Sequence, residues 1–376
     1  MKLFFRSLLP CAAVGLLLAS CDDDKQTDQP GGGDVTPPEI TAVDGFYLLN
    51  EGNMGSNKAS LDYFDATTGR YTTNIYPSRN PSAALELGDV GNDLKICGDY
   101  LYAVINGSGK VEVMNADDAV RVGQIDIANP RYVVDYDGFV YVSSYMTGTN
   151  GTGSVYKVNP ATLQVVDRVD VGYEPEEMAV VNGKLYVANS GGYYVYSGGA
   201  YDRTVSVIDL ASFTVAKNID VEVNLHRLRA DKNGRIYVSS RGNYADVESS
   251  LFVIDSSTDK VINHIDCGVA DMWIHGDKAY VYSSSYDQYW NATYSYNTID
   301  LNTMTVGAGS FISDGSESRI TAPNGIAVNP VTGDIYIADA RNYVSSGAVY
   351  CFSADGKYKW SQNTGDIPGH FAFKTR

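Results

Sequence analysis

Short apolar runs alternate with polar, glycine-rich segments along most of this chain of 376 residues. In seven places the apolar run carries a tyrosine and leads directly into a polar loop. These runs begin at Phe46, Leu101, Val140, Leu185, Ile236, Ala279 and Ile335. A period of roughly 40–50 residues indicates one folding unit repeated along the chain. Whatever recurs is then scaffold, and whatever departs from the repeat is a candidate for function.

Each unit predicts four strands, which we name A to D, and the fourth unit shows them most clearly. Its strands are expected at residues 177–181, 184–188, 204–210 and 214–221, with Asn-Gly at 182–183 as the turn between A and B. Asn-Gly between two apolar runs is a strong hairpin signal. The inner strands are apolar on both faces, as in sheets packed between neighbours. Seven such sheets predict an all-β, seven-bladed β-propeller.

The two ends of the chain predict how the propeller closes. The C-terminal segment 367–373 resembles another strand A, whereas the repeats begin with a strand B at Phe46. Pairing the two would complete one blade from both ends of the chain. It would also remove the unpaired sheet edges that an open array leaves exposed.

The first 20 residues predict a signal peptide, in which Lys2 and Arg6 precede an apolar run. The sequence Leu-Ala-Ser-Cys at 18–21 resembles a bacterial lipobox, with Cys21 as the lipidated residue. An ordinary secretory signal with an incidental cysteine is the alternative.

Residues 21–43 predict a lipidated cysteine followed by a flexible tether, and residues 44–376 form the predicted propeller. The tether is rich in proline, glycine and acidic residues, which cannot bury enough apolar surface to fold. Its acidic run at 22–24 resembles the surface-export signal of Bacteroidetes lipoproteins. We therefore expect a protein anchored by lipid in the outer membrane and facing the cell exterior.

Charge and cysteine content exclude some classes of function. The formal net charge of −17 argues against nucleic acid as a partner, because a basic surface is needed to displace counterions. Cys97, Cys267 and Cys351 are odd in number and lack C-x-x-C spacing, so they predict small buried hydrophobes and neither a disulfide framework nor a zinc site.

The candidate ligand-binding residues lie in the loops of one face. In a propeller the B–C and D–A loops share a face, and here the B–C loops are long, irregular and aromatic. Tyrosine and tryptophan among asparagine, serine and glycine are typical of recognition surfaces, and loops on a rigid scaffold commonly carry function. The B–C candidates are Tyr145, Tyr194, Tyr196, Tyr201, Arg241, Tyr244, Tyr286, Tyr289, Trp290, Arg341 and Tyr343. The D–A candidates, several of them expected around the central channel, are Arg131, His226, Trp273 and His370.

No reaction is specified by the sequence. Patterns for nucleophilic serine, zinc peptidase and phosphate-binding sites are absent, and no metal-ligand spacing occurs. We interpret the acidic segment 173–177 as a solvated loop, with acid–base work or calcium binding as the alternatives. The prediction is a protein that is not an enzyme, with no metal, cofactor or catalytic residue. A lactonase or lyase using His226 or His370 with a carboxylate is the enzymatic alternative.

The repeat itself, clearest between Pro175 and Asp209, resembles YncE/YVTN-type seven-bladed propellers over residues 45–376. More specific are the segments 49–55 (LNEGNMG), 87–94 (LGDVGNDL) and 101–113 (LYAVINGSGKVEV). Together with the lipobox and the acidic tether, they resemble the BtuG-like surface lipoproteins of Bacteroidetes.

This resemblance implies capture of cobalamin or other corrinoids, which are then passed to a BtuB-like TonB-dependent outer-membrane transporter. Aromatic faces would cover the macrocycle, and Asn, Ser and Arg would bind its amides and phosphate. Tyr and Trp stack on sugars equally well, so a glycan- or other nutrient-binding propeller lipoprotein stays open as an alternative.

Overall fold

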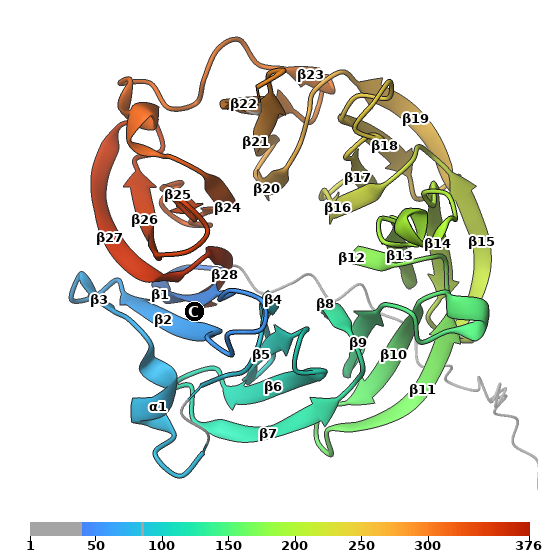
Figure 1. Ribbon diagram of the computed structural model, residues 1–376, viewed down its shortest axis with the longest axis horizontal. Coiled ribbons are helices and arrows are strands. Elements are labelled where there is room, and N and C mark those ends of the chain that lie inside the picture. The colour runs from blue at the N-terminus through green and yellow to red at the C-terminus, as the bar shows by residue number, and fades with distance from the viewer. Residues whose placement is uncertain (1–39, 84–85, 290) are drawn as a thin grey trace, which may run out of the picture. The chain divides into compact units, whose positions relative to one another are not determined.

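The computed structural model describes residues 40–83, 86–289 and 291–376. Within the unit Ile40–Arg376, the strands form seven four-stranded antiparallel sheets arranged around a common centre (Figure 1). The predicted seven-bladed β-propeller is therefore confirmed. The predicted signal peptide, Cys21 and nearly all of the tether lie outside the described residues and stay predictions.

The blades are numbered here by the order of their strands B in the chain. Blade 1 contains β28 (Pro368–Thr375), β1 (Val43–Asn50), β2 (Ser60–Asp65) and β3 (Arg70–Thr72). Blade 2 contains β4 (Gly91–Cys97), β5 (Tyr100–Ile105), β6 (Lys110–Asn115) and β7 (Arg121–Asp126). Blade 3 contains β8 (Pro130–Tyr136), β9 (Phe139–Ser144), β10 (Ser154–Asn159) and β11 (Gln164–Asp170).

Blades 4 to 7 follow the same plan. Blade 4 contains β12 (Pro175–Val181), β13 (Lys184–Asn189), β14 (Thr204–Asp209) and β15 (Thr214–Asp220). Blade 5 contains β16 (Leu225–Ala230), β17 (Arg235–Ser240), β18 (Ser250–Asp255) and β19 (Lys260–Ile265). Blade 6 contains β20 (Asp271–His275), β21 (Lys278–Tyr286), β22 (Ala292–Asp300) and β23 (Thr305–Val306). Blade 7 contains β24 (Pro323–Val328), β25 (Ile335–Asp339), β26 (Ser346–Phe352) and β27 (Tyr358–Asp366).

Blade 1 is completed by both ends of the described chain, as the sequence predicts. The last strand, β28, pairs antiparallel with β1, so that Phe46 lies opposite Phe373 and Leu48 opposite Phe371. Phe46 and Leu48 are buried with Phe371 in a cluster that also contains side chains of blade 7. Ring closure is therefore a packing interface as well as a hydrogen-bonded ladder.

The repeated tyrosine of strand B is buried in all seven blades. These residues are Tyr47, Tyr102, Tyr141, Tyr186, Tyr237, Tyr280 and Tyr336, and none is more than 8% exposed. Several of their hydroxyls reach the next blade. Tyr47 donates to the Ala116 carbonyl at 3.0 Å, and Tyr186 donates to the Asp259 carboxylate at 2.6 Å. The repeated tyrosines thus bind neighbouring blades to one another.

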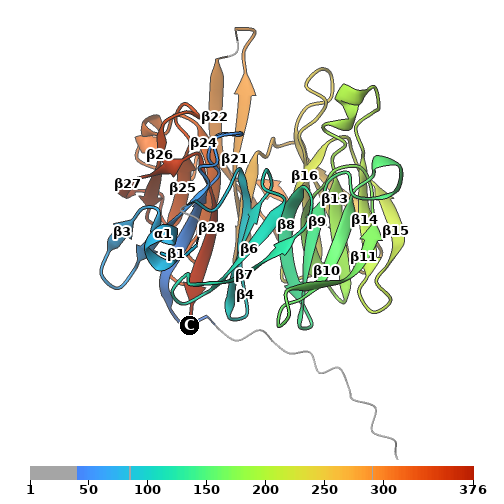
Figure 2. The same ribbon diagram turned by 60° about the horizontal axis from the view of Figure 1, so that its bottom comes forward.

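The two faces of the propeller differ. The B–C loops project from one face, which we call the loop face, and the hairpin of β21 and β22 rises furthest from it (Figure 2). The short A–B turns lie on the opposite face, which we call the turn face. The chain begins its first strand on the turn face, where the Thr41 amide donates to the Arg376 carbonyl at 2.8 Å.

Helices are few and short in the described part of the chain. They are α1 (Ile75–Arg79), η1 (Thr149–Gly151), η2 (Tyr194–Ser197) and η3 (Ser316–Arg319). Among the described residues, no helix has the length and apolarity needed to cross a membrane. Cys97, Cys267 and Cys351 are free and buried, which confirms their prediction as small buried hydrophobes.

Candidate functional site

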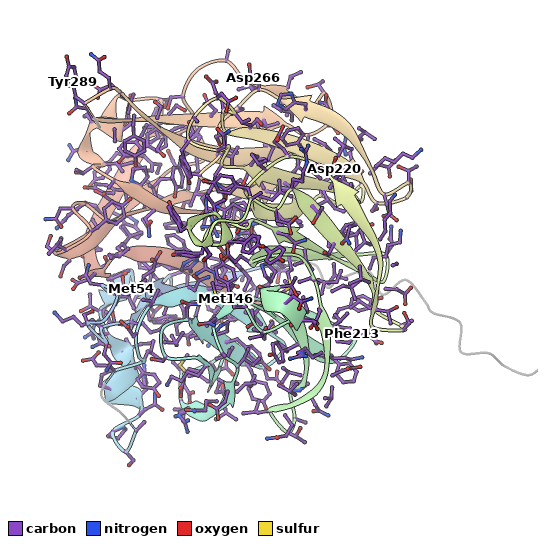
Figure 3. The ribbon with its side chains drawn as sticks, turned by 45° about the vertical axis from the view of Figure 1, so that its right-hand side comes forward. Met54, Met146, Phe213, Asp220, Asp266 and Tyr289 are labelled. Carbon is purple, nitrogen blue, oxygen red and sulfur yellow. The ribbon has the colours of Figure 1, made fainter. Side chains whose placement is uncertain are left out.

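Large aromatic side chains stand exposed on the loop face. Tyr196 is 82% exposed, Tyr244 and Tyr289 are each 75% exposed, and Tyr286 and Tyr343 are exposed to a lesser degree. They come from the B–C loops of blades 4, 5, 6 and 7, and Figure 3 shows Tyr289 at an outer tip of the molecule. Exposed apolar side chains gathered on one face are typical of interaction surfaces.

The loops that carry these tyrosines are ordered by short polar side chains. The Asn243 side-chain oxygen accepts hydrogen bonds from three backbone amides, those of residues 245 to 247. The Asp287 carboxylate accepts from the amides of Tyr289 and Asn291. Asn342 binds the amides of Val344 and Ser345 in the same way. Local hydrogen bonds of this kind fix the backbone of a turn, so the exposed tyrosines are carried by ordered loops.

Two of the loop tyrosines also adopt backbone conformations that side chains disfavour. Tyr244 has φ of 57° and Tyr343 has φ of 58°, which lie in the left-handed region. Such conformations cost of order 1–3 kcal/mol and cluster at ligand-binding positions. Nothing in the packing of the scaffold requires an aromatic residue at either position, because both side chains are exposed.

A buried polar layer lies beneath the loop face, at the loop-face ends of strands A. We define it by Arg131, Tyr132, Tyr145, Glu176, His226, Arg227, Arg241 and Asp271. Its centre is Glu176, which is 1% exposed and accepts from Arg131 at 3.1 Å, from Arg241 at 3.5 Å and from the Tyr145 hydroxyl. Burial opposes ionisation of Glu176, but Arg131, Arg241 and the Tyr145 hydrogen bond outweigh it and keep the pKa below its usual value.

The second half of the polar layer crosses the channel from blade 3 to blades 5 and 6. Arg227 donates to the Tyr132 hydroxyl at 3.1 Å and forms an ion pair with Asp271 at 2.9 Å. The Tyr132 hydroxyl also lies 3.2 Å from Nε2 of His226. Burial, followed by the positive charges of Arg241, Arg227 and Arg131, lowers the pKa of His226 well below its usual value. His226 is therefore a neutral imidazole.

Two further carboxylates flank this layer. Glu177 accepts from the Leu228 amide at 2.9 Å and pairs with Arg229 at 2.9 Å. Burial raises the pKa of Glu177, although the positive charges of Arg229 and Arg227 act to lower it. Glu51 accepts from the Asn324 side chain at 2.9 Å and lies 3.6 Å from Nε2 of His370. Although burial opposes its ionisation, the hydrogen bond and charge of His370 lower the pKa of Glu51.

The structure divides the predicted site residues into groups. The polar layer contains Arg131, Tyr145, His226 and Arg241, while His370 lies beside it. Exposed on the loop face are Tyr196, Tyr244, Tyr286, Tyr289 and Tyr343.

The remaining predicted residues are placed individually. Tyr194 stacks on Tyr173 with ring centroids 4.0 Å apart, and Tyr201 is half-buried. Arg341 binds the Ser346 carbonyl and Asn363 within its own blade. Trp273 lies deeper, on strand β20 in the central channel. Trp290 lies outside the described residues.

One interpretation of the sequence is wrong. The acidic segment 173–177 is not a solvated loop, because Glu174, Glu176 and Glu177 are all at most 5% exposed. Glu176 and Glu177 are paired with arginines from other blades, which are distant in sequence, and Glu174 accepts from the Tyr193 amide. Tyr132 and Glu51 were not among the predicted site residues. Their only signal was position. Tyr132 stands near the loop-face end of β8, which borders the channel, and Glu51 directly follows β1, the strand next to β28.

The family of the chain follows from comparison with known proteins. Residues 44–371 match the family model described as Domain of unknown function (DUF5074). The chain belongs to this family. A search of curated proteins finds no match to the chain.

The DUF5074 chain is also similar to solved propeller structures. A proposed 6-phosphogluconolactonase from Bacteroides fragilis is 13% identical, with a TM-score of 0.62, over 90% of this chain and 99% of the other. A quinonprotein alcohol dehydrogenase-like protein from Bacteroides thetaiotaomicron is 14% identical, with a TM-score of 0.61, over 88% and 78%. AztD from Citrobacter koseri is 12% identical, with a TM-score of 0.56, over 89% and 99%. At these identities the likeness shows the fold alone.

In the described part of this DUF5074 protein, no group of three or more His, Cys, Asp and Glu side chains is placed to hold a metal ion. The carboxylates of the polar layer are instead engaged by arginine and tyrosine. Buried charges are thus held in ion pairs and hydrogen bonds, while aromatic rings are exposed on the loop face.

Proposed function

We propose that this protein captures cobalamin or another corrinoid on its loop face, without catalysis, and passes it to a BtuB-like TonB-dependent outer-membrane transporter. The observation that carries the proposal is the set of exposed tyrosines from four blades, held on ordered loops above the buried polar layer. Aromatic anchors of this kind commonly dominate binding affinity.

The chemistry of a corrin suits this surface. It is a broad macrocycle with an amide fringe and a nucleotide loop that carries a phosphate. Tyrosine rings cover apolar edges at a small cost in side-chain entropy, while their hydroxyls and the loop asparagines bind amides. Arg241, which is partly exposed at 32% of its side chain, supplies a cation at the border of the polar layer. Its long contact of 3.5 Å to Glu176 leaves donors of the guanidinium for a phosphate.

The direction in which the chain enters the propeller supports capture at this face. Strand β1 begins on the turn face, opposite the B–C loops. The loop face is thus the face away from the start of the first strand. This matches a protein that collects a ligand from outside the cell and delivers it to a transporter.

The proposal is tested by equilibrium dialysis against cyanocobalamin, with the bound fraction read from visible absorbance. We expect retention by the wild-type protein, and weaker retention by Tyr289→Ala and Tyr244→Ala. Loss of one aromatic contact typically costs ~1–3 kcal/mol, or roughly five- to hundredfold in affinity. Tyr136→Ala is the matched control, because Tyr136 is 39% exposed but lies at the turn-face end of β8.

Absence of retention by the wild-type protein would refute corrinoid capture. Retention on a polysaccharide gel that is lost in Tyr289→Ala would then favour the glycan-binding alternative. Hand-over is tested separately, by mixing the corrinoid-loaded protein with a purified BtuB-like transporter in detergent. Transfer of the red ligand to the transporter fraction is expected, and retention of all ligand by the propeller would contradict this step.

A further inference from the structure

The principal cavity of the described propeller does not open among the loop-face tyrosines. It occupies about 600 Å³ of the central channel and is lined by strands A of all seven blades. Its lining extends to the turn-face ends of these strands, at Ile96, Asp135, Ala230 and Thr375, and includes no residue of the B–C loops. We call it the channel cavity. Its size lies within the range of small-molecule sites.

The polar layer forms the roof of the channel cavity. Tyr132, Arg227 and Asp271 belong both to that layer and to the cavity lining. They are tied to one another across the channel and are each at most 6% exposed. Two different surfaces therefore meet at this layer. The exposed loop face lies on one side, and the channel cavity, which extends to the turn face, lies on the other.

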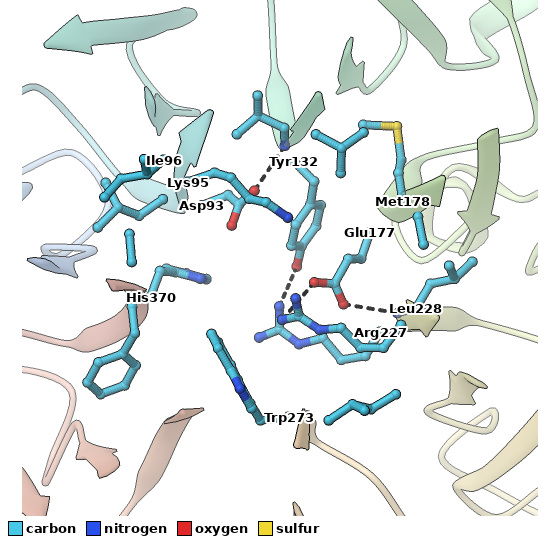
Figure 4. Close-up of a pocket in the computed structure, with 18 of the residues that line it drawn as sticks. Asp93, Lys95, Ile96, Tyr132, Glu177, Met178, Arg227, Leu228, Trp273 and His370 are labelled. Carbon is cyan, nitrogen blue, oxygen red and sulfur yellow. Dashed lines mark hydrogen bonds and ion pairs between the residues drawn. The ribbon is translucent and has the colours of Figure 1, made fainter. Parts of the chain in front are cut away.

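The walls of the channel cavity combine an aromatic surface with cations. Trp273 projects into the space between His370 and Arg227 (Figure 4). Its ring meets Phe373 edge-to-face, with centroids 5.7 Å apart, and the Arg229 guanidinium lies over its face at 5.5 Å from the centroid. Arg227 and Arg229 stand two residues apart on β16, so both face the same side of the strand.

The charges in the cavity are only partly balanced within it. Asp271 pairs with Nε of Arg227 at 2.9 Å, and Glu177 pairs with a terminal nitrogen of Arg229 at 2.9 Å. Nε of Arg229 is buried without a hydrogen-bond partner. Lys95 also lines the cavity, two residues from Asp93 on β4, and it forms no ion pair within the described residues. Asp93 instead accepts from the Val133 amide at 2.9 Å. Among the described residues of the lining, Lys95 and Nε of Arg229 are thus the cationic donors left without a partner, in a lining that also contains Asp93 and Asp135.

The same walls disfavour a cationic ligand. A site for an ammonium group offers open aromatic faces, but here arginines already lie against the rings. Arg229 lies over Trp273, while Arg227 and Arg131 lie over Tyr132. A cation entering the chamber would meet these guanidinium groups directly.

We propose that the channel cavity is a second binding site, entered from the turn face, for a small planar carboxylate that packs on Trp273 and pairs with Lys95. Arg229, whose Nε lacks a hydrogen-bond partner, supplies a further donor to the carboxylate. This site is separate from the loop face and does not depend on corrinoid capture.

The test uses 2-naphthoate as the probe, with 2-naphthamide and 2-naphthylmethylammonium as its neutral and cationic counterparts. Isothermal titration should show saturable binding of 2-naphthoate, weaker binding of the amide and no binding of the ammonium compound. Lys95→Gln should weaken 2-naphthoate roughly tenfold, because a hydrogen bond to a charged group is lost, and should leave the amide unchanged. Trp273→Leu should weaken both by a similar factor, since stacking is lost.

Tyr289→Ala on the loop face is the control and should bind 2-naphthoate as the wild type does. Lys95 is partly exposed and unpaired, so Lys95→Gln keeps the test decisive even if Trp273→Leu fails to fold. The proposal is overturned if 2-naphthoate does not bind, if the ammonium compound binds more tightly, or if Lys95→Gln binds 2-naphthoate as the wild type does. A failure of cyanocobalamin retention would leave each of these results unchanged.

Discussion

Two sets of tyrosines in this propeller share a residue type and differ in almost everything else. Those of strand B recur in every blade and are at most 8% exposed, and several of their hydroxyls bond to the next blade. Those of the B–C loops do not recur, and six of those described are well exposed on one face. Tyrosines that recur in every blade therefore belong to the scaffold, whereas the exposed tyrosines of the B–C loops are not part of the repeat. The loops can vary because the strands beneath them do not.

The largest expected effect comes from breaking the scaffold at its closure. Deletion of residues 368–376 removes β28, which supplies strand A of blade 1 and buries Phe371 and Ala372. Because β1 would then expose an unpaired edge, we expect loss of a cooperative transition or a fall in Tm of more than ~10 °C, measured by circular dichroism. An unchanged melting curve would show that closure does not stabilise the propeller.

Removing single hydroxyls distinguishes a strand-B tyrosine that bonds to the next blade from one that does not. Tyr186→Phe removes a hydrogen bond to Asp259 and leaves that carboxylate with one partner fewer. We expect a loss of about 1–2 kcal/mol in the free energy of unfolding, measured by urea titration. Tyr102→Phe is the matched control, because the Tyr102 hydroxyl is buried without a hydrogen-bond partner. Equal losses in the two variants would contradict the inter-blade role of the Tyr186 hydroxyl.

The buried polar layer contains His226, and this residue predicts that the stability of the protein depends on pH. The pKa of His226 is lowered in the folded state, mainly by burial, so the unfolded chain binds the proton more readily. Stability should therefore be full above the ordinary histidine pKa of ~6.5 and should be lost as the pH falls below it. His226→Gln should flatten the decline in Tm between pH 7 and pH 5. His264→Gln on the exposed side of β19 is the control, and an equal flattening there would refute the assignment.

The smallest expected effect on stability comes from the loop set. Tyr196→Ala and Tyr244→Ala remove side chains that are 82% and 75% exposed. We expect changes within about 0.5 kcal/mol in the free energy of unfolding, because little buried area is lost. A loss as large as that of Tyr186→Phe would mean that these tyrosines belong to the scaffold, and the division between the two sets would fail.

The fold could be predicted from the sequence because its signals are local and repeated. The strands expected in the fourth unit, 177–181, 184–188, 204–210 and 214–221, correspond to β12 to β15 within a few residues. The Asn-Gly turn and the apolar runs that fix them lie within a few positions of one another. Closure was also predictable, because a strand A without its partner stands at the end of the chain.

The polar layer could not be predicted in the same way. Glu176 meets Arg131 and Arg241 only after three blades have packed around the channel. No local sequence pattern predicts contacts between residues so distant in sequence. Without its arginine partners, an acidic segment has the same sequence pattern as a solvated loop. The direction of a side chain on strand A decides whether it enters the channel or a blade interface, so the place of Trp273 also required the structure.

The pairing of β1 with β28 sets the order of events as the chain is made. Among the strands of the propeller, synthesis delivers β1 first and β28 last, so β1 has no partner on one side until β28 is available. A contact across so long a stretch of sequence forms slowly, since the intervening chain must already be arranged. Blade 1 is therefore the last blade that can be finished. A polypeptide released without its final strand would carry six blades able to form and one open seam.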